Sequence, residues 1–396
     1  MKNTIIKIII CTLTLSIYAE SLEFDSIYSV EGILKDNEKQ QRDSVLKWLV
    51  SSKKSLKENY GLSLGVDNFT HYLDSNSDQD PSDAASNVFR LYGTWTLIGK
   101  GTPNDGALIF KVESRDAIGN NLSTQALGPT LGYAGTFAST YSDKGWVYTN
   151  FYWKQHFADG KGGVVFGQVD VYDYVNVNSI GSPWTGFTNL AFQHQPTFPG
   201  PPQGLGAAAS YHFNSNWSVL AGFVNANNDP HKPIESAKKL FDEGETFKHI
   251  AVGWLPKWAA RFDRSLQFTF WQVDKREKAG VESGSGFSFL MSTIRGKWTP
   301  FLRAGYADGG GAMLDRDISV GTGLKLRDEK DLAGLGIGWG RAPYNDRDQY
   351  TLEAFYRYGV KSFMQLSPSI QYISKPANDL STDDIFVIGA RLRVFF

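Results

Sequence analysis

The feature that most constrains this chain is a strict two-residue alternation at its carboxyl end. Over residues 385–396 every even position is apolar, ending in Phe396, whereas the odd positions include Arg391 and Arg393. Successive side chains of a β-strand point to opposite faces, so this is the pattern of a strand with one apolar and one partly charged face. Residues 348–358 repeat the pattern. An apolar face beside a charged face is typical of a strand between lipid and a water-filled lumen.

The alternation recurs from residue 60 onward, in segments of roughly the ten residues that a tilted membrane-spanning strand needs. About sixteen segments carry it: residues 61–72, 88–98, 106–116, 146–157, 162–172, 204–213, 217–226, 248–256, 265–273, 287–294, 297–306, 318–327, 332–341, 348–358, 364–373 and 384–396. Aromatic residues make up 14% of the chain and there are 40 glycines, a composition that suits many short strands. The chain is therefore predicted to be all-β.

The connections between these segments alternate in length. Short ones, such as residues 158–161, 214–216 and 328–331, alternate with longer ones, and residues 117–145, 173–203 and 227–247 are very long. This alternation is typical of a bacterial barrel whose two termini lie in the periplasm, and a soluble sandwich has no reason to show it. Every backbone group in lipid must be paired, so the last strand is expected to pair with the first. The predicted fold is a transmembrane antiparallel β-barrel of about sixteen strands with a short N-terminal helical segment.

Residues 1–19 are predicted to be a secretory signal peptide. Lys2 and Lys7 precede and flank an apolar stretch, and Ala19 is a small residue at a plausible cleavage point. Cys11, the only cysteine, falls in this segment, so the mature chain owes nothing to disulfides. Together with the barrel pattern, the signal predicts the outer membrane of a Gram-negative-type bacterium.

Residues 20–59 form a polar, lysine-rich leader before the barrel, which is assigned to residues 60–396. Apolar residues recur in the leader at roughly helical spacing: Val45, Leu46, Leu49, Val50 and Leu56. They predict a short amphipathic helix, at the periplasmic mouth or inside the barrel. A partly ordered leader before the first strand is the alternative.

Charged and amide side chains gather on the face predicted to line the lumen. They are Arg90, Lys111, Glu113, Arg115, Gln168, Asp170, Arg303, Glu353, Arg357, Gln371, Arg391 and Arg393. A sugar is uncharged and offers hydroxyls, which arginine and glutamate can bind as donor and acceptor without creating a field of one sign. The structural alternative is a set of wall salt bridges. Without residues 1–19 the net charge is −3, from 38 basic and 41 acidic side chains. This balance lacks the excess of basic residues that is typical of proteins that bind nucleic acid.

Two further features bear on the width of the lumen. Four prolines, at positions 196, 199, 201 and 202, lie in the loop at residues 173–203, which is either a stiff surface loop or, as we predict, a loop that folds inward to narrow the pore. Glycines at positions 334, 336, 338 and 340 alternate with larger residues within one strand, which argues against a nucleotide-binding turn. They are expected to widen the lumen or to admit a folded loop.

Several long motifs resemble those of the carbohydrate-selective porins of the OprB type. They are YWKQHFADGKGGVVFGQVDVYDYVNV at residues 152–177, SPWTGFTNLAF at 182–192, GLGAAA at 204–209, DQYTLEAFYRY at 348–358 and LSPSIQYI at 366–373. The resemblance covers most of residues 60–396. It implies a sixteen-stranded outer-membrane barrel that passes small saccharides, with a pore constriction formed by Arg90, Glu113 and Arg115. Trp184 lies in the matching tryptophan-bearing loop.

The predicted function is passive, carbohydrate-selective diffusion of small sugars. A general or anion-preferring porin, a non-conducting barrel plugged by residues 20–59 and a soluble sugar-binding sandwich remain alternatives. No catalytic residue, cofactor or metal is expected, since the six histidines show no metal-ligand spacing. The expected partners are small carbohydrates, outer-membrane lipid and the barrel-assembly machinery, for which Phe396 resembles the usual terminal signal. The barrel is expected to be a monomer or a homotrimer.

Overall fold

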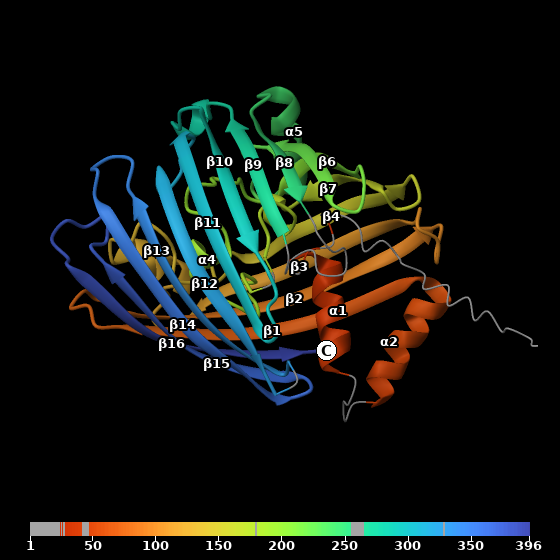
Figure 1. Ribbon diagram of the computed structural model, residues 1–396, viewed down its shortest axis with the longest axis horizontal. Helices are drawn as coiled ribbons and strands as arrows, with labels where there is room; N and C mark the ends of the chain where they lie inside the picture. Colours follow the sequence, from red (N-terminus) through yellow and green to blue (C-terminus); the bar gives the residue numbers. More distant parts are fainter. Residues whose placement is uncertain are drawn as a thin grey trace, which may run out of the picture.

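The computed structural model describes residues 24, 26, 28–41, 47–178, 180–254, 265–327 and 329–396. These residues form a closed antiparallel barrel of sixteen strands, each paired with its neighbours in sequence (Figure 1). The strands are β1 Leu62–Ser75, β2 Asp83–Ile98, β3 Gly106–Ile118, β4 Gly145–Phe157, β5 Gly162–Val169, β6 Gly204–His212, β7 Trp217–Asn225, β8 Thr246–Trp254, β9 Ser265–Val273, β10 Gly284–Ser292, β11 Trp298–Gly309, β12 Arg316–Leu326, β13 Asp331–Arg341, β14 Asp348–Lys361, β15 Met364–Ser374 and β16 Asp384–Phe395. The predicted signal peptide, residues 1–19, lies outside the described residues.

The barrel closes between its first and last strands, as the sequence predicts. β1 pairs with β16 over a register that runs from Asp67 opposite Phe395 to Ser75 opposite Val387. Beyond it, Val66 and Phe396 exchange two backbone hydrogen bonds, of 2.9 and 2.8 Å. Each of the sixteen predicted segments overlaps one strand. The fifth ends early, at Val169, because the chain turns inward there.

The predicted facing of the carboxyl-terminal strand is confirmed. The outer face of β16 exposes Phe386 and Ile388, whereas Arg391 and Arg393 on the inner face are each 2% exposed. Apolar side chains also cover the outer face of the neighbouring strands. This outer surface suits lipid, and the polar inner surface suits a hydrated lumen.

Two long loops fold into the barrel from one end, called here the long-loop end. Residues 170–203 contain a 3-10 turn, η1 (Val171–Asp173), and the short helix α4 (Leu190–Gln193). Their aromatic side chains Phe187 and Phe192 are fully buried, which confirms the predicted inward fold of this loop. Residues 119–144, with α3 (Thr124–Thr130), fill the lumen beside it. The inward fold of this second loop was not predicted.

The glycines of β13 make room for the inward loop. A Cβ atom added at Gly336 would lie 2.7 Å from the Phe192 ring, and one at Gly338 would lie 3.7 Å from it. A larger residue at position 336 therefore requires the loop to shift. Of the two expectations for these glycines, the structure supports the admission of a folded loop.

The leader contains two helices rather than one. α1 (Val30–Gln40) packs inside the barrel, and α2 (Lys47–Tyr60) follows it and has no buried residue. The predicted apolar positions 49, 50 and 56 lie on α2, and positions 45 and 46 lie outside the described residues. Of the two places expected for this helix, the inside of the barrel is wrong, since α2 has no buried residue and borders a cavity beside the short β2–β3 turn. In Figure 1, α2 stands clear of the strands at the lower right.

The remaining helical elements lie at the long-loop end. α5 (Pro233–Asp242) lies at the top of the barrel in Figure 1, and the 3-10 turn η3 (Glu277–Ala279) lies between β9 and β10. In the part of the chain that the structure describes, no helix combines the length and the apolar character needed to cross a membrane.

Candidate pore constriction

Three charged side chains line up on the inner face of β3. Lys111, Glu113 and Arg115 are two residues apart, so a single strand directs all three into the lumen. Arg115 Nη2 lies 2.5 Å and its Nε lies 2.7 Å from Glu113 Oε2, whereas Lys111 Nζ lies 4.0 Å from Glu113 Oε1. The register of β3 against β4 shifts beside Lys111, which is consistent with a bulge.

The inward loop adds a second carboxylate to this row. Asp173, at the end of η1, has its Oδ2 atom 3.8 Å from Lys111 Nζ and accepts a hydrogen bond of 3.0 Å from Asn150 Nδ2 of β4. Burial raises the pKa of Asp173 to about 7, partly opposed by Lys111 and reinforced by the carboxylate of Asp170. Sequence reasoning missed both residues: Asp173 lies just beyond the fifth expected segment, 162–172, and Asn150 lies beside the register shift between β3 and β4. Lys111, Glu113, Arg115 and Asp173 are called the charge cluster below.

The charge cluster borders a cavity of about 390 Å³. Its wall also contains Tyr28, Tyr172, Trp184 and Gln193, together with loop residues near the long-loop end such as Lys144 and Gln203. Glu113 Oε1 and Asn150 Oδ1 are buried and have no hydrogen-bond partner within the described part of the chain. The wall therefore combines cations, the carboxylate of Glu113 with one oxygen that has no hydrogen-bond partner, and aromatic rings.

Arg90 faces the lumen but points away from the charge cluster. It lies opposite Glu113 in the β2–β3 register, yet its Nη2 atom lies 2.6 Å from Asp67 Oδ2 on β1. Its guanidinium carbon lies 4.0 Å from the centre of the Trp184 ring, and its side chain is fully buried. The structure thus brings Glu113 and Arg115 together and places Arg90 in a separate buried network.

Trp184 lines two cavities. One is the 390 Å³ cavity of the charge cluster, and the other has a volume of about 200 Å³ and reaches Lys325 and Glu329 beside the short β12–β13 turn. Trp184 is 5% exposed, and its ring lies 4.9 Å from that of Phe69 and 5.7 Å from that of Tyr141. The two cavities, called here the outer and the inner cavity, therefore share Trp184, which lies in a tightly packed aromatic layer with Phe69 and Tyr141.

Other predicted lumen residues hold the inward loop by its carbonyl groups. Arg303 donates to the carbonyls of His194 at 2.9 Å and of Asn176 at 3.2 Å. Arg391 donates to those of Pro183 at 2.6 Å and Gly186 at 3.1 Å. Arg357 donates to that of Thr185 at 3.1 Å.

Carboxylate and amide side chains complete the anchorage of the loops. Both carboxylate oxygens of Glu353 accept backbone N–H groups, from Thr188 at 2.8 Å and from Asn189 at 2.9 Å. Gln371 donates to the carbonyl of Phe137 at 3.0 Å and accepts from the Asn189 amide at 2.9 Å. Near β5, Asp170 accepts from Gln203 at 2.6 Å, and Gln168 donates to the carbonyl of Tyr148. Among the described residues, no group of histidine, cysteine and carboxylate side chains could hold a metal ion.

Comparison with known proteins agrees with this architecture. A family model described as carbohydrate-selective porin, OprB family, matches residues 274–396. The high-pH structure of Pseudomonas putida OprB superposes with a TM-score of 0.71 and 16% identity, covering 88% of this chain and 97% of that one. Its low-pH structure gives a TM-score of 0.52 and 14% identity over 89% of this chain and 98% of that one.

An outer membrane protein from another genus also has this fold. The trimer form of in-vitro folded Vibrio cholerae OmpT gives a TM-score of 0.52 and 15% identity, over 85% of this chain and 99% of that one. No curated protein matches the sequence. The resemblance read from the motifs is thus confirmed: residues 274–396 match the carbohydrate-selective porin family, OprB, and the whole barrel has the fold of the P. putida OprB structure.

Proposed function

We propose that this protein is an outer-membrane channel for passive, carbohydrate-selective diffusion of small sugars. The observation that carries the proposal is the charge cluster, in which two cations and two carboxylates line the 390 Å³ outer cavity together with aromatic side chains. Lys111, Glu113 and Arg115 are the predicted members, and Asp173 adds the second carboxylate.

The chemistry of this wall suits a neutral solute with many hydroxyls. Lysine and arginine donate hydrogen bonds, while Glu113 Oε1 is an acceptor without a hydrogen-bond partner in the described chain. Tyr172 and Trp184 can cover the apolar face of a sugar ring. Each net hydrogen bond is worth only about 1 kcal/mol, so the solute is slowed without being trapped.

The competing proposal is a general or anion-preferring porin, which the many arginines of the inner wall favour. Arg303 and Arg391, however, are 0% and 2% exposed, and neither of them lines the outer or the inner cavity. Their donors are directed to loop carbonyls. Beside the pore the charges are of mixed sign, so we expect weak preference between small anions and cations.

Liposome swelling separates these proposals. Proteoliposomes in a panel of sugars of increasing size should swell faster than those in neutral or zwitterionic non-sugar solutes of matched size. Equal rates for sugars and matched non-sugars would contradict sugar selectivity and favour a general porin. The reversal potential in a KCl gradient, measured on the same preparation, reports any preference for anions.

The membrane setting is part of the proposal. The apolar outer face and the sorted loop lengths support an outer-membrane barrel with its short turns in the periplasm. We also propose that residues 1–19 direct export, that residues 20–59 are a leader to the barrel at 60–396, and that the assembly machinery recognises the carboxyl end. Whether the barrel is a monomer or a homotrimer is decided by its mass in detergent.

A further inference from the structure

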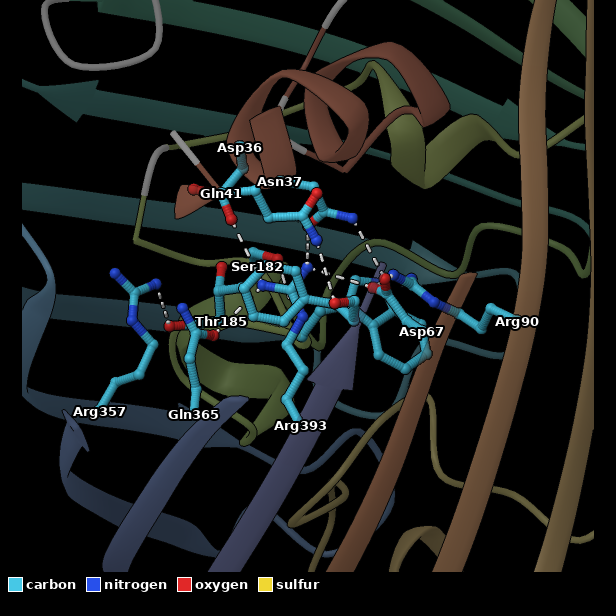
Figure 2. Close-up of polar contacts among 12 residues, drawn as sticks. Asp36, Asn37, Gln41, Asp67, Arg90, Ser182, Thr185, Arg357, Gln365 and Arg393 are labelled. Carbon is cyan, nitrogen blue, oxygen red and sulfur yellow. Dashed lines mark hydrogen bonds and ion pairs between the residues drawn. The ribbon is translucent and has the colours of Figure 1, made fainter. Parts of the chain in front are cut away.

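The leader helix α1 is fastened to the inner wall of the barrel by a buried asparagine. The Asn37 amide nitrogen lies 3.2 Å from Asp67 Oδ1 and 2.6 Å from the Tyr92 hydroxyl, and its Oδ1 accepts from Arg393 Nη2 at 2.6 Å. Asn37 and Asp67 are both fully buried. Figure 2 shows Asn37 pointing from the helix into the group formed by Asp67, Arg90 and Arg393. Asn37 thus ties α1 to β1, β2 and β16.

Further contacts fix α1 along its length. Near its start, Glu31 forms a 2.6 Å ion pair with Lys154 of β4. In its middle, Asp36 lies 3.3 Å from Arg393, and after its end Gln41 donates to the carbonyl of Phe395 at 3.1 Å. These partners of α1 lie on β1, β2, β4 and β16, and Lys39 near the end of the helix forms a further ion pair with Glu329 in the turn between β12 and β13.

The residues before α1 reach the charge cluster. The Tyr28 hydroxyl donates to the carbonyl of Gln193 at 3.1 Å, and the Phe24 ring lies 5.2 Å from that of Tyr174. The Ser26 hydroxyl donates to the carbonyl of Asp173, itself a member of the cluster. The leader thus extends through the lumen from the short-turn end to the constriction.

The leader contributes to the wall of both cavities. Tyr28 lines the outer cavity, whereas Ile33, Asp36, Lys39 and Gln40 line the inner one. Helix α2 contributes to neither of these two cavities. A solute that moves between the cavities therefore meets α1 side chains after it passes Trp184.

We propose that the described residues between positions 24 and 41 form part of the inner wall of the pore and set its size limit, with Asp36, Lys39 and Gln40 forming a second sugar-contacting site on the short-turn side of Trp184. An α-helix with its side chains is about 10–12 Å across, so it occupies a large part of the lumen cross-section. The site deepens the proposed function and rests on it. The narrowing by α1 does not depend on which solute passes.

Deletion of residues 24–41 tests the size limit. In planar bilayers we expect the variant's single-channel conductance to rise about twofold or more, because a helix-sized obstacle is removed. Proteoliposomes should then admit oligosaccharides that the wild type excludes. As control, alanine at exposed Ser51 and Ser52 of α2 should change neither quantity. Unchanged conductance and size limit in the deletion variant would overturn the proposal.

A single-cysteine experiment covers the case in which the deletion variant does not insert. Cys11 lies in the predicted signal, so Gln40→Cys gives the mature chain one thiol in the inner cavity, and Ser52→Cys gives one on α2. A charged methanethiosulfonate added from the short-turn side should lower the current and weaken glucose block only for Gln40→Cys. No change in current with either variant would overturn the proposal. If the wild-type channel itself shows no preference for sugars, the proposed function is overturned instead.

Discussion

Arg115 is the most exposed member of the charge cluster, and it lines the outer cavity. Its side chain is 11% exposed, whereas that of Glu113 is 0% exposed. In Arg115→Ala the pore should widen, and Glu113 loses its nearest cation, since Lys111 lies 4.0 Å away. We expect higher ion conductance, a shift toward cations and weaker block by glucose in planar bilayers.

The matched control is Arg316→Ala, because Arg316 is exposed and lines neither cavity. This variant should behave as the wild type. If Arg115→Ala retains both wild-type glucose block and ion selectivity, the charge cluster is not the filter. The aromatic layer around Trp184 then takes that role.

Asp173 should make the selectivity of the pore depend on pH. Its pKa is raised to about 7, so the carboxyl is ionised above that pH and neutral below it. The folded chain binds this proton more tightly than the unfolded chain, so its contribution to stability falls as the pH rises through about 7. Protonation of Asp173 leaves Glu113 as the only ionised carboxylate of the charge cluster, beside the two cations Lys111 and Arg115. Lowering the pH from about 8 to about 6 should therefore shift the KCl reversal potential toward anions.

The groups facing Asp173 are Lys111, Glu113, Asn150 and Asp170. Asp173→Asn should behave at all pH values in this range as the protonated wild type does. A shift of the same size in Asp173→Asn would assign the titration to another group and contradict this account.

At the residue level, the sequence predicted the direction in which side chains point better than it predicted the residues that they contact. The two-residue alternation correctly predicts that Glu353 and Arg391 point inward. The two-residue spacing of Glu113 and Arg115 correctly predicts that these two side chains lie together. The alternation cannot show that both Glu353 oxygens bind loop N–H groups, or that Arg90 turns to Asp67 on the next strand. Those contacts depend on register and on chain more than 150 residues away. Asp173 has no signal in sequence because its burial and pKa come from the folded loop.

At the scale of the strand, lipid-facing and lumen-facing positions should differ in their tolerance of charge. Leu352 lies in the middle of β14 on the face that carries Tyr350 and Tyr356. Leu352→Arg should cost about 2–4 kcal/mol of folding free energy if it lies at the bilayer midplane, because the guanidinium must leave water. Unfolding by urea in lipid vesicles measures this cost.

Leu380→Arg is the control, since Leu380 lies in the β15–β16 loop and is 66% exposed. It introduces the same side chain in water and should cost less than about 1 kcal/mol. Equal losses at the two positions would mean that the assignment of β14 to the membrane is wrong.

The elements differ in how visible they are in sequence. The strands can be recognised in the sequence because the side chains of each strand must point alternately to lipid and to the lumen. Helix α1 has only Val30, Ile33 and Leu34 as buried apolar side chains, and much of its attachment comes from Asn37 and its neighbours. A helix held by polar contacts to a polar wall has a weak hydrophobic pattern. The apolar spacing therefore pointed to α2, which follows it.

For the whole molecule, the last residue is part of the closure of the barrel. Phe396 exchanges two backbone hydrogen bonds with Val66, and its ring stacks on that of Phe363 at 5.9 Å. Deletion of Phe396 should lower the amount of protein inserted in the outer membrane, while channels that do insert keep the wild-type conductance because Phe396 lines neither cavity. Immunoblots of membrane fractions and bilayer recordings measure the two quantities. Normal insertion of the truncated chain would contradict an assembly role.

The central claim is that the lumen distinguishes a sugar from other small polar solutes. It is tested most directly by the single-channel KCl current of the wild-type protein as glucose or the open-chain polyol sorbitol is added. The account predicts that glucose lowers the current at lower concentrations than sorbitol, because only the ring offers an apolar face to Tyr172 and Trp184 while its hydroxyls bind the charge cluster. Equal reduction by both solutes, in proportion to the viscosity of the solution, would contradict it.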